Sequence, residues 1–223
     1  MNILKNLFSR KKINTYLNTQ YQIQSLFTEI KNGDEISDGE FDKLYPPYFQ
    51  EISSVQWSPI HICKLVLDLF NLKEEDQLLD VGSGVGKFCF IAAILTKANV
   101  TGVEKRKELV QVSNGILKQS KLKNLNFIHK RMEDLDWNQF SCLYFYNPFY
   151  ENISPHHRID DEIPEGIKKF SENLNVTKQK LSDLKKGTKI VTYHSFGGKM
   201  PSSYKKIKHI NLTLGELESW IKI

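Results

Sequence analysis

Leu78-Leu-Asp-Val-Gly-Ser-Gly-Val-Gly-Lys-Phe88 is the stretch of sequence from which the fold of this chain follows. Its apolar start is typical of a buried strand, and its end continues into the apolar pattern of a helix. The three alternating glycines allow a tight turn and let a ligand approach without meeting a Cβ atom. The dinucleotide-binding pattern G-x-G-x-x-G would need a glycine where this chain has Lys87. The spacing therefore predicts a ligand-binding turn, but not a dinucleotide site.

Strand and helix patterns alternate along the rest of the chain. Strand patterns span residues 77–82, 99–104, 125–130, 142–147 and 187–194, and helix patterns span residues 86–97, 106–119 and 165–185. Such alternation implies a mostly parallel sheet with helices on both faces. Two further strand patterns, 205–212 and 215–222, have no helix between them and predict an antiparallel hairpin. The predicted fold class is α/β, with a Rossmann-like seven-stranded sheet that ends in this hairpin.

The first 55 residues are the least regular part of the chain. Helical patterns cover residues 2–12 and 18–31, and we expect Tyr45-Pro-Pro-Tyr48 to break any helix because proline lacks an N–H donor. Ser58 and Pro59 have the residue types of an N-cap and a first helical position. We therefore expect a helical N-terminal extension or lid at 1–55 and an α/β domain at 56–223.

The composition is that of an ordinary globular protein. Of the 223 residues, 40% are hydrophobic and 26% charged, and the net charge of +5 permits an acidic partner without requiring nucleic acid. No apolar run reaches the roughly 20 residues that span a bilayer, and the basic start at Met1–Lys12 lacks the apolar core of a secretion signal. The cysteines lie in apolar segments without metal-ligand spacing, which favours reduced core residues in a cytoplasmic protein. They are Cys63, Cys89 and Cys142.

The glycine turn resembles motif I of the class I S-adenosylmethionine-dependent methyltransferases. The resemblance implies an enzyme whose cofactor is S-adenosyl-L-methionine, on the seven-stranded fold of that superfamily. In an open parallel sheet, ligands bind beyond the carboxyl ends of the strands, where the loop amides can receive the methionine part of the cofactor. The candidate residues of this loop are Asp80, Gly82, Ser83, Gly84 and Gly86. A tight turn without a ligand is the alternative.

The next two strands supply candidates for the rest of the cofactor. Glu104 ends the second strand, where its carboxylate can accept hydrogen bonds from both ribose hydroxyls, unless it is only a solvated acid at a helix start. After the third strand, related methyltransferases often have Gly-Asp, whereas this chain has Lys130-Arg131-Met132. Met132 could still cover the adenine ring, with Glu133 or Asp134 as its polar contact. Alternatively, these acids are surface groups.

The fourth strand runs into Asn147-Pro-Phe-Tyr150, which resembles motif IV, (Asp/Asn)-Pro-Pro-(Tyr/Phe), of methyltransferases that act on nitrogen. Methyl transfer is an in-line displacement, so the enzyme mainly aims a lone pair at the methyl group. The side-chain oxygen of Asn147 and the carbonyl of Pro148 can accept hydrogen bonds from an attacking NH group. Phe149 or Tyr150 can pack against an amine and exclude water. An ordinary strand-ending turn is the alternative.

Phe149 stands where adenine-N6 and glutamine-amide methyltransferases favour a second proline. The cofactor half is instead similar to the DOT1-like lysine methyltransferases, in Asp80-Val-Gly-Ser-Gly-Val-Gly86, Gly102-Val-Glu-Lys105 and Asn147-Pro-Phe149. This likeness implies that Lys105 belongs to the cofactor site as well. It does not extend to the N-terminal region or to residues 151–223, so it does not identify the substrate.

A lysine acceptor must lose a proton before it attacks, at a cost of about 4.6 kcal/mol at pH 7 from a reference pKa near 10.4. A desolvating aromatic channel would lower that pKa. No dedicated base stands out, and the candidates are Tyr45, Tyr146, Tyr150 and Glu151. The pair His156-His157 is either a surface feature or a base or metal pair. Trp57 is either a wall of the cofactor site or a core residue.

The leading prediction is an S-adenosylmethionine-dependent N-methyltransferase that acts on a protein side-chain nitrogen. A base in RNA or DNA is the second candidate acceptor, although the basic excess is small and no nucleic-acid module flanks the catalytic part. A small-molecule amine is the third, because the first 55 residues could close over a small pocket. A cofactor-binding protein without catalysis is a further alternative, against which the intact Asn147 argues. Neither a membrane partner nor a metal is expected.

Overall fold

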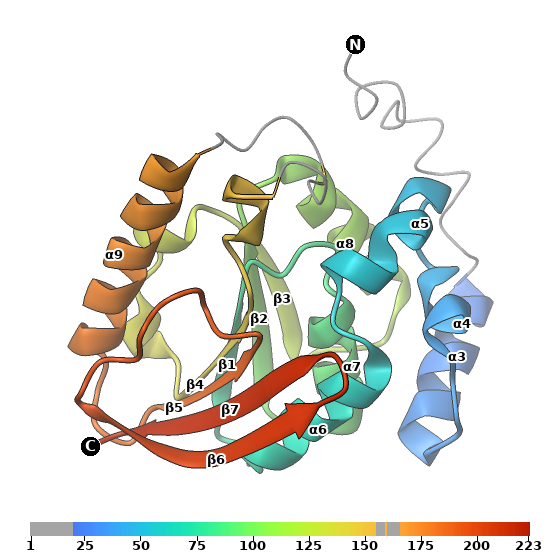
Figure 1. The fold of residues 1–223 in the computed structure, drawn as a ribbon. Helices are drawn as coiled ribbons and strands as arrows, with labels where there is room; N and C mark the ends of the chain where they lie inside the picture. Colours follow the sequence, from blue (N-terminus) through green and yellow to red (C-terminus); the bar gives the residue numbers. More distant parts are fainter. Residues whose placement is uncertain (1–19, 155–158, 160–165) are drawn as a thin grey trace.

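A seven-stranded sheet forms the centre of the computed structural model, which describes residues 20–154, 159 and 166–223 (Figure 1). Its strand order is β3-β2-β1-β4-β5-β7-β6. The first five strands run parallel, and β7 pairs antiparallel with both β5 and β6. The strands are β1 (Gln77–Val81), β2 (Asn99–Glu104), β3 (Leu125–His129), β4 (Cys142–Tyr146), β5 (Lys189–Tyr193), β6 (Tyr204–Leu212) and β7 (Gly215–Lys222). The predicted fold class is confirmed, including the terminal hairpin.

Helices cover both faces of this sheet (Figure 1). Alternate residues of β1 and β4 pack into two separate apolar clusters, one with α6, α7 and α8 and the other with α9. This alternation follows from the pleat, which points successive side chains to opposite faces. The helices of the described residues are α3 (Gln20–Asn32), α4 (Asp38–Asp42), α5 (Pro47–Gln56), α6 (Ile60–Phe70), α7 (Lys87–Leu95), α8 (Lys107–Gln119) and α9 (Ile167–Asp183). Short 3-10 turns are η1 (Met132–Asp134), η2 (Trp137–Gln139) and η3 (Tyr150–Asn152).

Helix starts near the N-terminus differ in detail from the sequence-based expectations. Ser58 was expected to cap α6, but Pro59 occupies the N-cap position and the Ser58 hydroxyl instead shares a 2.6 Å hydrogen bond with the Tyr144 hydroxyl. That prediction was wrong because a tertiary partner 86 residues away competes for the hydroxyl. The segment Tyr45–Tyr48 meets the expectation of a helix break only in part, because α4 ends before it at Asp42 and Pro47 opens α5, which includes Tyr48. Proline suits a first helical position because the N–H that it lacks has no partner there. The expected helix over 2–12 lies outside the described residues.

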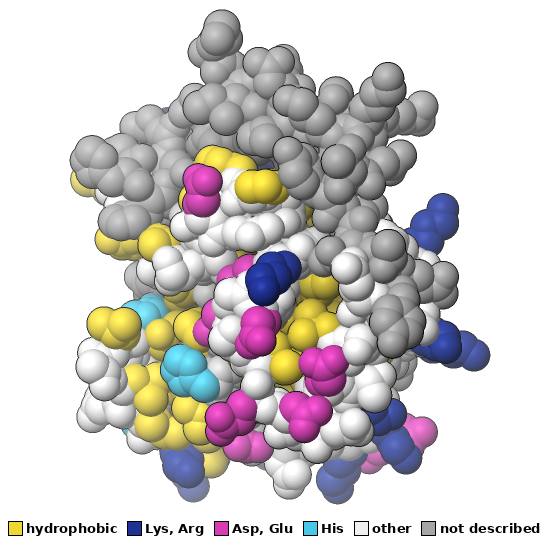
Figure 2. Space-filling view, turned by 90° about the vertical axis from the view of Figure 1, so that its right-hand side faces the viewer, with side chains coloured by type: hydrophobic (Ala, Val, Ile, Leu, Met, Phe, Trp, Pro, Cys, Tyr) yellow, Lys and Arg dark blue, Asp and Glu magenta, His cyan; other side chains and the backbone are white. Residues whose placement is uncertain are grey.

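Helices α3 to α5 pack against the same apolar cluster as α7. The rings of Phe27 and Phe90 lie 5.7 Å apart, and Lys87 at the start of α7 forms ion pairs with Asp38 at 2.7 Å and Asp42 at 2.8 Å. Figure 2 shows this side of the molecule, where acidic side chains gather. Exposed acids on and between these helices are Asp34, Glu35, Glu40 and Glu51. All three cysteines are buried and unpaired, and no helix of the described residues could cross a bilayer.

Candidate functional site

The candidate site lies at the carboxyl ends of β1, β2 and β4. The switch point of the sheet is between β1 and β4, because the chain adds β2 and β3 on one side of β1 and then continues with β4 and β5 on the other. Crevices at such switch points are the usual ligand sites of open α/β sheets. Two adjoining cavities open there, and we call them the narrow cavity, of about 90 Å³, and the wide cavity, of about 600 Å³. Both are lined by Gly82, Glu104, Arg106 and Pro148. One elongated ligand could therefore occupy both.

The glycine turn forms the floor between the cavities. All three glycines have positive φ angles, of 83° at Gly82, 55° at Gly84 and 85° at Gly86, a region that side chains disfavour. A Cβ atom on Gly84 would lie 2.4 Å from the indole of Trp57, so the indole covers the turn closely. Gly86 differs from the other two, because it caps α7 and packs on Phe127 without lining either cavity.

Glu104 joins the glycine turn to the second strand. Its side chain is buried, and its Oε2 atom accepts a hydrogen bond of 3.2 Å from the Gly84 amide. The Oε1 atom accepts one of 2.8 Å from the Arg106 amide. These contacts hold the carboxylate at the junction of the two cavities, where it has further lone pairs for a ligand.

Asp80 and Ser83 lie beneath the turn beside a much smaller cavity of about 20 Å³. Burial raises the pKa of Asp80 to about 7, although a hydrogen bond from the Cys89 thiol opposes the shift. The Ser83 hydroxyl is buried and finds no hydrogen-bond partner within the described residues. Trp57 borders both this cavity and the wide one, and it also belongs to the apolar core cluster, so both interpretations of this residue describe part of its surroundings.

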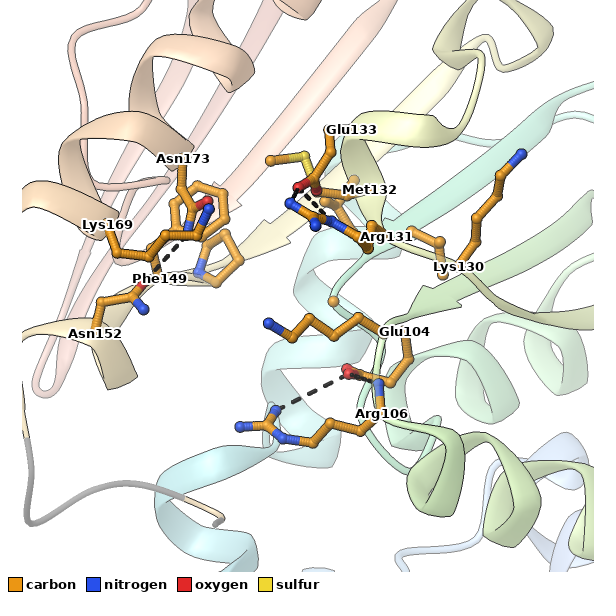
Figure 3. Close-up of a pocket in the computed structure, with 15 residues that line it drawn as sticks. Glu104, Arg106, Lys130, Arg131, Met132, Glu133, Phe149, Asn152, Lys169 and Asn173 are labelled. Atoms are coloured by element: carbon orange, nitrogen blue, oxygen red, sulfur yellow. Dashed lines mark hydrogen bonds and ion pairs between the residues drawn. The ribbon is translucent and has the colours of Figure 1, made fainter. Parts of the chain in front are cut away.

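The narrow cavity combines apolar walls with several cations (Figure 3). Met132, Glu133 and Phe149 line it, as does Lys105, whereas Asp134 does not. Burial lowers the pKa of Lys105, and the charges of Arg106, Arg131 and Lys169 lower it further. Further polar residues line this cavity that were not predicted from the sequence and that come from three separate elements: Arg106, Asn152, Lys169 and Asn173.

The wide cavity receives Asn147 and Tyr150 from the corner after β4. Phe149 turns to the narrow cavity instead, so only Tyr150 of the two aromatic candidates lies beside the wide one. Asn147 has a φ of 38°, and its amide donates a 3.2 Å hydrogen bond to the Ser195 carbonyl. Other aromatic lining groups are Trp57, Tyr146, Tyr193 and His194. The last of these was not anticipated, because nothing in its local sequence suggests a site.

Most of the candidate bases already have hydrogen-bond partners or lie in the core, away from the two cavities. Tyr45 is buried in the core against Phe41, and burial raises its pKa well above the usual value. The Tyr146 hydroxyl donates to the Val55 carbonyl at 3.0 Å, and burial raises its pKa to about 12. Glu151 accepts hydrogen bonds from the Arg106 guanidinium at 2.6 Å and the Ile159 amide at 3.0 Å. His156 and His157 lie outside the described residues.

Comparison with known proteins identifies the cofactor half. Residues 72–149 match the family described as a methyltransferase domain, which confirms that prediction for this part of the chain. No curated protein matches the sequence significantly.

Several solved structures are similar to this chain in fold, although their sequences are not. An RNA methyltransferase from Salinibacter ruber in complex with S-adenosyl-L-homocysteine is 19% identical, with a TM-score of 0.56 over 74% of this chain and 92% of that one. The putative methyltransferase yhhF from Escherichia coli is 14% identical, with a TM-score of 0.53 over 73% and 84%. MtNAS in complex with MTA and tNA is 11% identical, with a TM-score of 0.55 over 92% and 71%. At such identities the likeness establishes the fold alone.

Proposed function

We propose that this class I S-adenosylmethionine-dependent methyltransferase methylates a nitrogen, with a lysine-like protein side chain as its acceptor. The observation that carries the proposal is that Asn147 and Pro148 line the same cavity as Gly82 and Gly84. A Cβ atom on Gly82 would lie only 3.6 Å from the Pro148 side chain, so the corner directly adjoins the glycine turn. Hydrogen-bond acceptors of the corner therefore face the place where the cofactor's methyl group is expected.

The residues present fit S-adenosyl-L-methionine. Met132 and Phe149 offer apolar surfaces for the adenine in the narrow cavity, and Glu104 stands at the junction to receive the ribose hydroxyls. The wide cavity, which Gly82 and Gly84 line and which adjoins the narrow one at Glu104, has room for the methionine part. When bound, the cofactor supplies a sulfonium-activated methyl group. The chain itself supplies binding, orientation and exclusion of water.

The walls of the wide cavity suit an amine on a slender chain. The rings of Tyr146 and Tyr193 stack 4.9 Å apart, and Trp57 and Tyr150 add further aromatic surface. Aromatic surroundings remove water from an ammonium group and so lower its pKa, which favours the neutral, nucleophilic amine. The last turn of α5 lines this cavity, and the exposed acids on and between α3 to α5 give the neighbouring side of the molecule negative charge that would attract a basic protein segment (Figure 2).

A base in RNA is the second candidate acceptor, and one observation favours it. Lys105, Lys130, Arg131 and Lys169 line the narrow cavity, where they could attract phosphates (Figure 3). One of the similar solved structures is also described as an RNA methyltransferase.

Labelling of an extract discriminates between these acceptors. The protein is incubated with S-adenosylmethionine carrying a tritiated methyl group and a cell extract, which is then divided into protein and RNA fractions. The proposal expects protease-sensitive label that appears as methyl-lysine after hydrolysis. Label removed by ribonuclease would contradict the protein acceptor while supporting the RNA candidate. The Asn147→Ala variant serves as the control for labelling by the site itself.

A further inference from the structure

His194 occupies a strained position at the edge of the wide cavity. It follows β5 and lines this cavity together with Asn147 and Gly84. His194 and Ser195 have φ angles of 57° and 64°, and the facing Asn147 has 38°. Non-glycine residues rarely adopt such angles, and where they persist the strain often accompanies a functional site. The hydrogen bond from the Asn147 amide to the Ser195 carbonyl joins the two strained segments.

The surrounding structure determines where the imidazole lies. A Cβ atom on Gly215 would lie 2.0 Å from the His194 ring, so the ring occupies space that only glycine leaves open. The Tyr193 ring, at the end of β5, lies 4.2 Å away, and the Tyr146 ring lies 5.9 Å away on β4. The His194 amide also donates to the Glu216 carbonyl at 3.0 Å. Three strands therefore position one side chain at the cavity.

The imidazole is available for a ligand in its neutral form. Within the described residues, no hydrogen bond forms at either ring nitrogen of His194. Burial lowers the pKa of His194, and the carboxylate of Glu216 on β7 opposes this shift. The other titratable groups around it are Tyr146 and Tyr193, whose pKa values burial raises above the usual value. The cavity-lining Glu104, Arg106 and Glu151 are already bonded to one another or to backbone amides.

We propose that His194 accepts the proton that the attacking nitrogen of the acceptor must lose. An ammonium acceptor gives one proton to the imidazole, and its freed lone pair forms the new N–C bond to the methyl group. The electron pair of the broken C–S bond stays on sulfur, which becomes a neutral thioether. The imidazolium then releases its proton to water. This step rests on the proposed transfer to nitrogen, and a neutral imidazole fits it because two cations would repel each other in one cavity.

The test removes the imidazole and keeps the backbone angle. Glycine adopts a positive φ freely and asparagine tolerates it, so His194→Gly and His194→Asn should fold. Methyl transfer is measured with tritiated cofactor and whichever extract fraction the wild-type protein labels. A positioned base typically contributes about 10²- to 10⁴-fold, so both variants should lose rate on this scale while cofactor affinity is unchanged. Added imidazole should partly restore the rate of His194→Gly. The matched control is His209→Asn on the hairpin, which should keep wild-type activity.

The pH dependence of the rate and the titration of the His194 ring distinguish a base from a residue that only supports the structure. The wild-type rate should reach a plateau at pH values above the pKa of His194, whereas the rate of His194→Asn should keep rising with pH as the acceptor amine loses its proton to water. The ring protons followed by NMR should titrate below pH 6.5. A variant with the wild-type rate or with the wild-type pH profile would overturn the inference. Label in RNA instead of protein would contradict only the proposed acceptor, because the His194 comparison proceeds with either fraction.

Discussion

Glu104 lies at the junction of the two cavities and lines both of them. Each of its carboxylate oxygens accepts a hydrogen bond from the protein, one from the Gly84 amide and one from the Arg106 amide. The same carboxylate borders both cavities, so its loss would affect the cofactor along its length. Glu104 also positions Arg106 through the hydrogen bond from the Arg106 amide, and the Arg106 guanidinium in turn donates a hydrogen bond to Glu151.

Replacement of Glu104 by alanine should weaken cofactor binding. Hydrogen bonds to a charged group contribute about 1–3 kcal/mol, which corresponds to roughly a 5- to 150-fold increase in Kd. Isothermal calorimetry with S-adenosylmethionine measures the change. The control is Glu74→Ala, which removes an exposed carboxylate whose ion-pair partner among the described residues is the exposed Lys97. Equal affinities in the two variants would show that Glu104 is structural.

Asn147 is expected to act on turnover more than on cofactor affinity. Asn147 lines the wide cavity, whereas other residues line the narrow cavity in which the adenine is proposed to bind. Asn147→Ala should therefore lower kcat by about 10²- to 10³-fold, the scale for losing a group that positions reacting atoms. Calorimetry should show cofactor affinity within a few-fold of wild type. Asn147→Gly, which relieves the φ of 38°, separates loss of the amide from backbone strain.

At the scale of elements, a buried lysine connects the N-terminal helices to the glycine turn. Lys87 is the first residue of α7, directly after the turn, and only 2% of its side chain is exposed. Asp42 of α4, with 6% exposed, lies 2.8 Å from its ammonium group. This ion pair attaches α4 to the helix that begins at the candidate cofactor site. We therefore propose that the N-terminal helices stabilise the turn, in addition to any role as a lid.

Lys87→Met should destabilise the whole protein. It removes the cation while leaving Asp42 buried, a change that typically costs about 3–5 kcal/mol. Chemical denaturation measures the free energy of unfolding, and Asp42→Asn in the same chain should recover part of the loss. The matched control is Lys97→Met, which breaks the exposed Lys97 to Glu74 pair and should cost less than about 1 kcal/mol. Similar losses in Lys87→Met and Lys97→Met would contradict the role of the buried pair.

Across the whole molecule, candidate site residues at the ends of strands could be predicted from the sequence. Residues whose positions depend on tertiary contacts could not. Gly84, Glu104 and Asn147 were predictable because parallel strands bring their carboxyl ends to one edge. His194 was not, since its place depends on a glycine of the following hairpin. The Ser58 cap failed for a related reason, because Tyr144 engages its hydroxyl. Local patterns carry no information on such distant partners.

Buried Asp80 makes the stability of the whole molecule depend on pH. Its pKa is raised to about 7 by burial, well above the value near 4 of an unfolded chain. Between these values the folded protein holds a proton that the unfolded chain has released. The stabilisation associated with that proton is therefore fully present below about pH 4 and is lost as the pH rises towards 7. Three pKa units correspond to a loss of about 4 kcal/mol at most.

Asp80→Asn should remove this dependence, because the amide cannot ionise. Urea denaturation without cofactor should show that the wild-type free energy of unfolding falls between pH 5 and pH 8, with a much smaller fall in the variant. Glu151, whose pKa burial also raises, contributes a slope of the same sign in both proteins, and His194, whose pKa burial lowers, contributes one of the opposite sign. Asp34→Asn, at an exposed acid, should retain the wild-type slope. Equal pH dependence in the wild-type protein and in Asp80→Asn would contradict a raised pKa for Asp80.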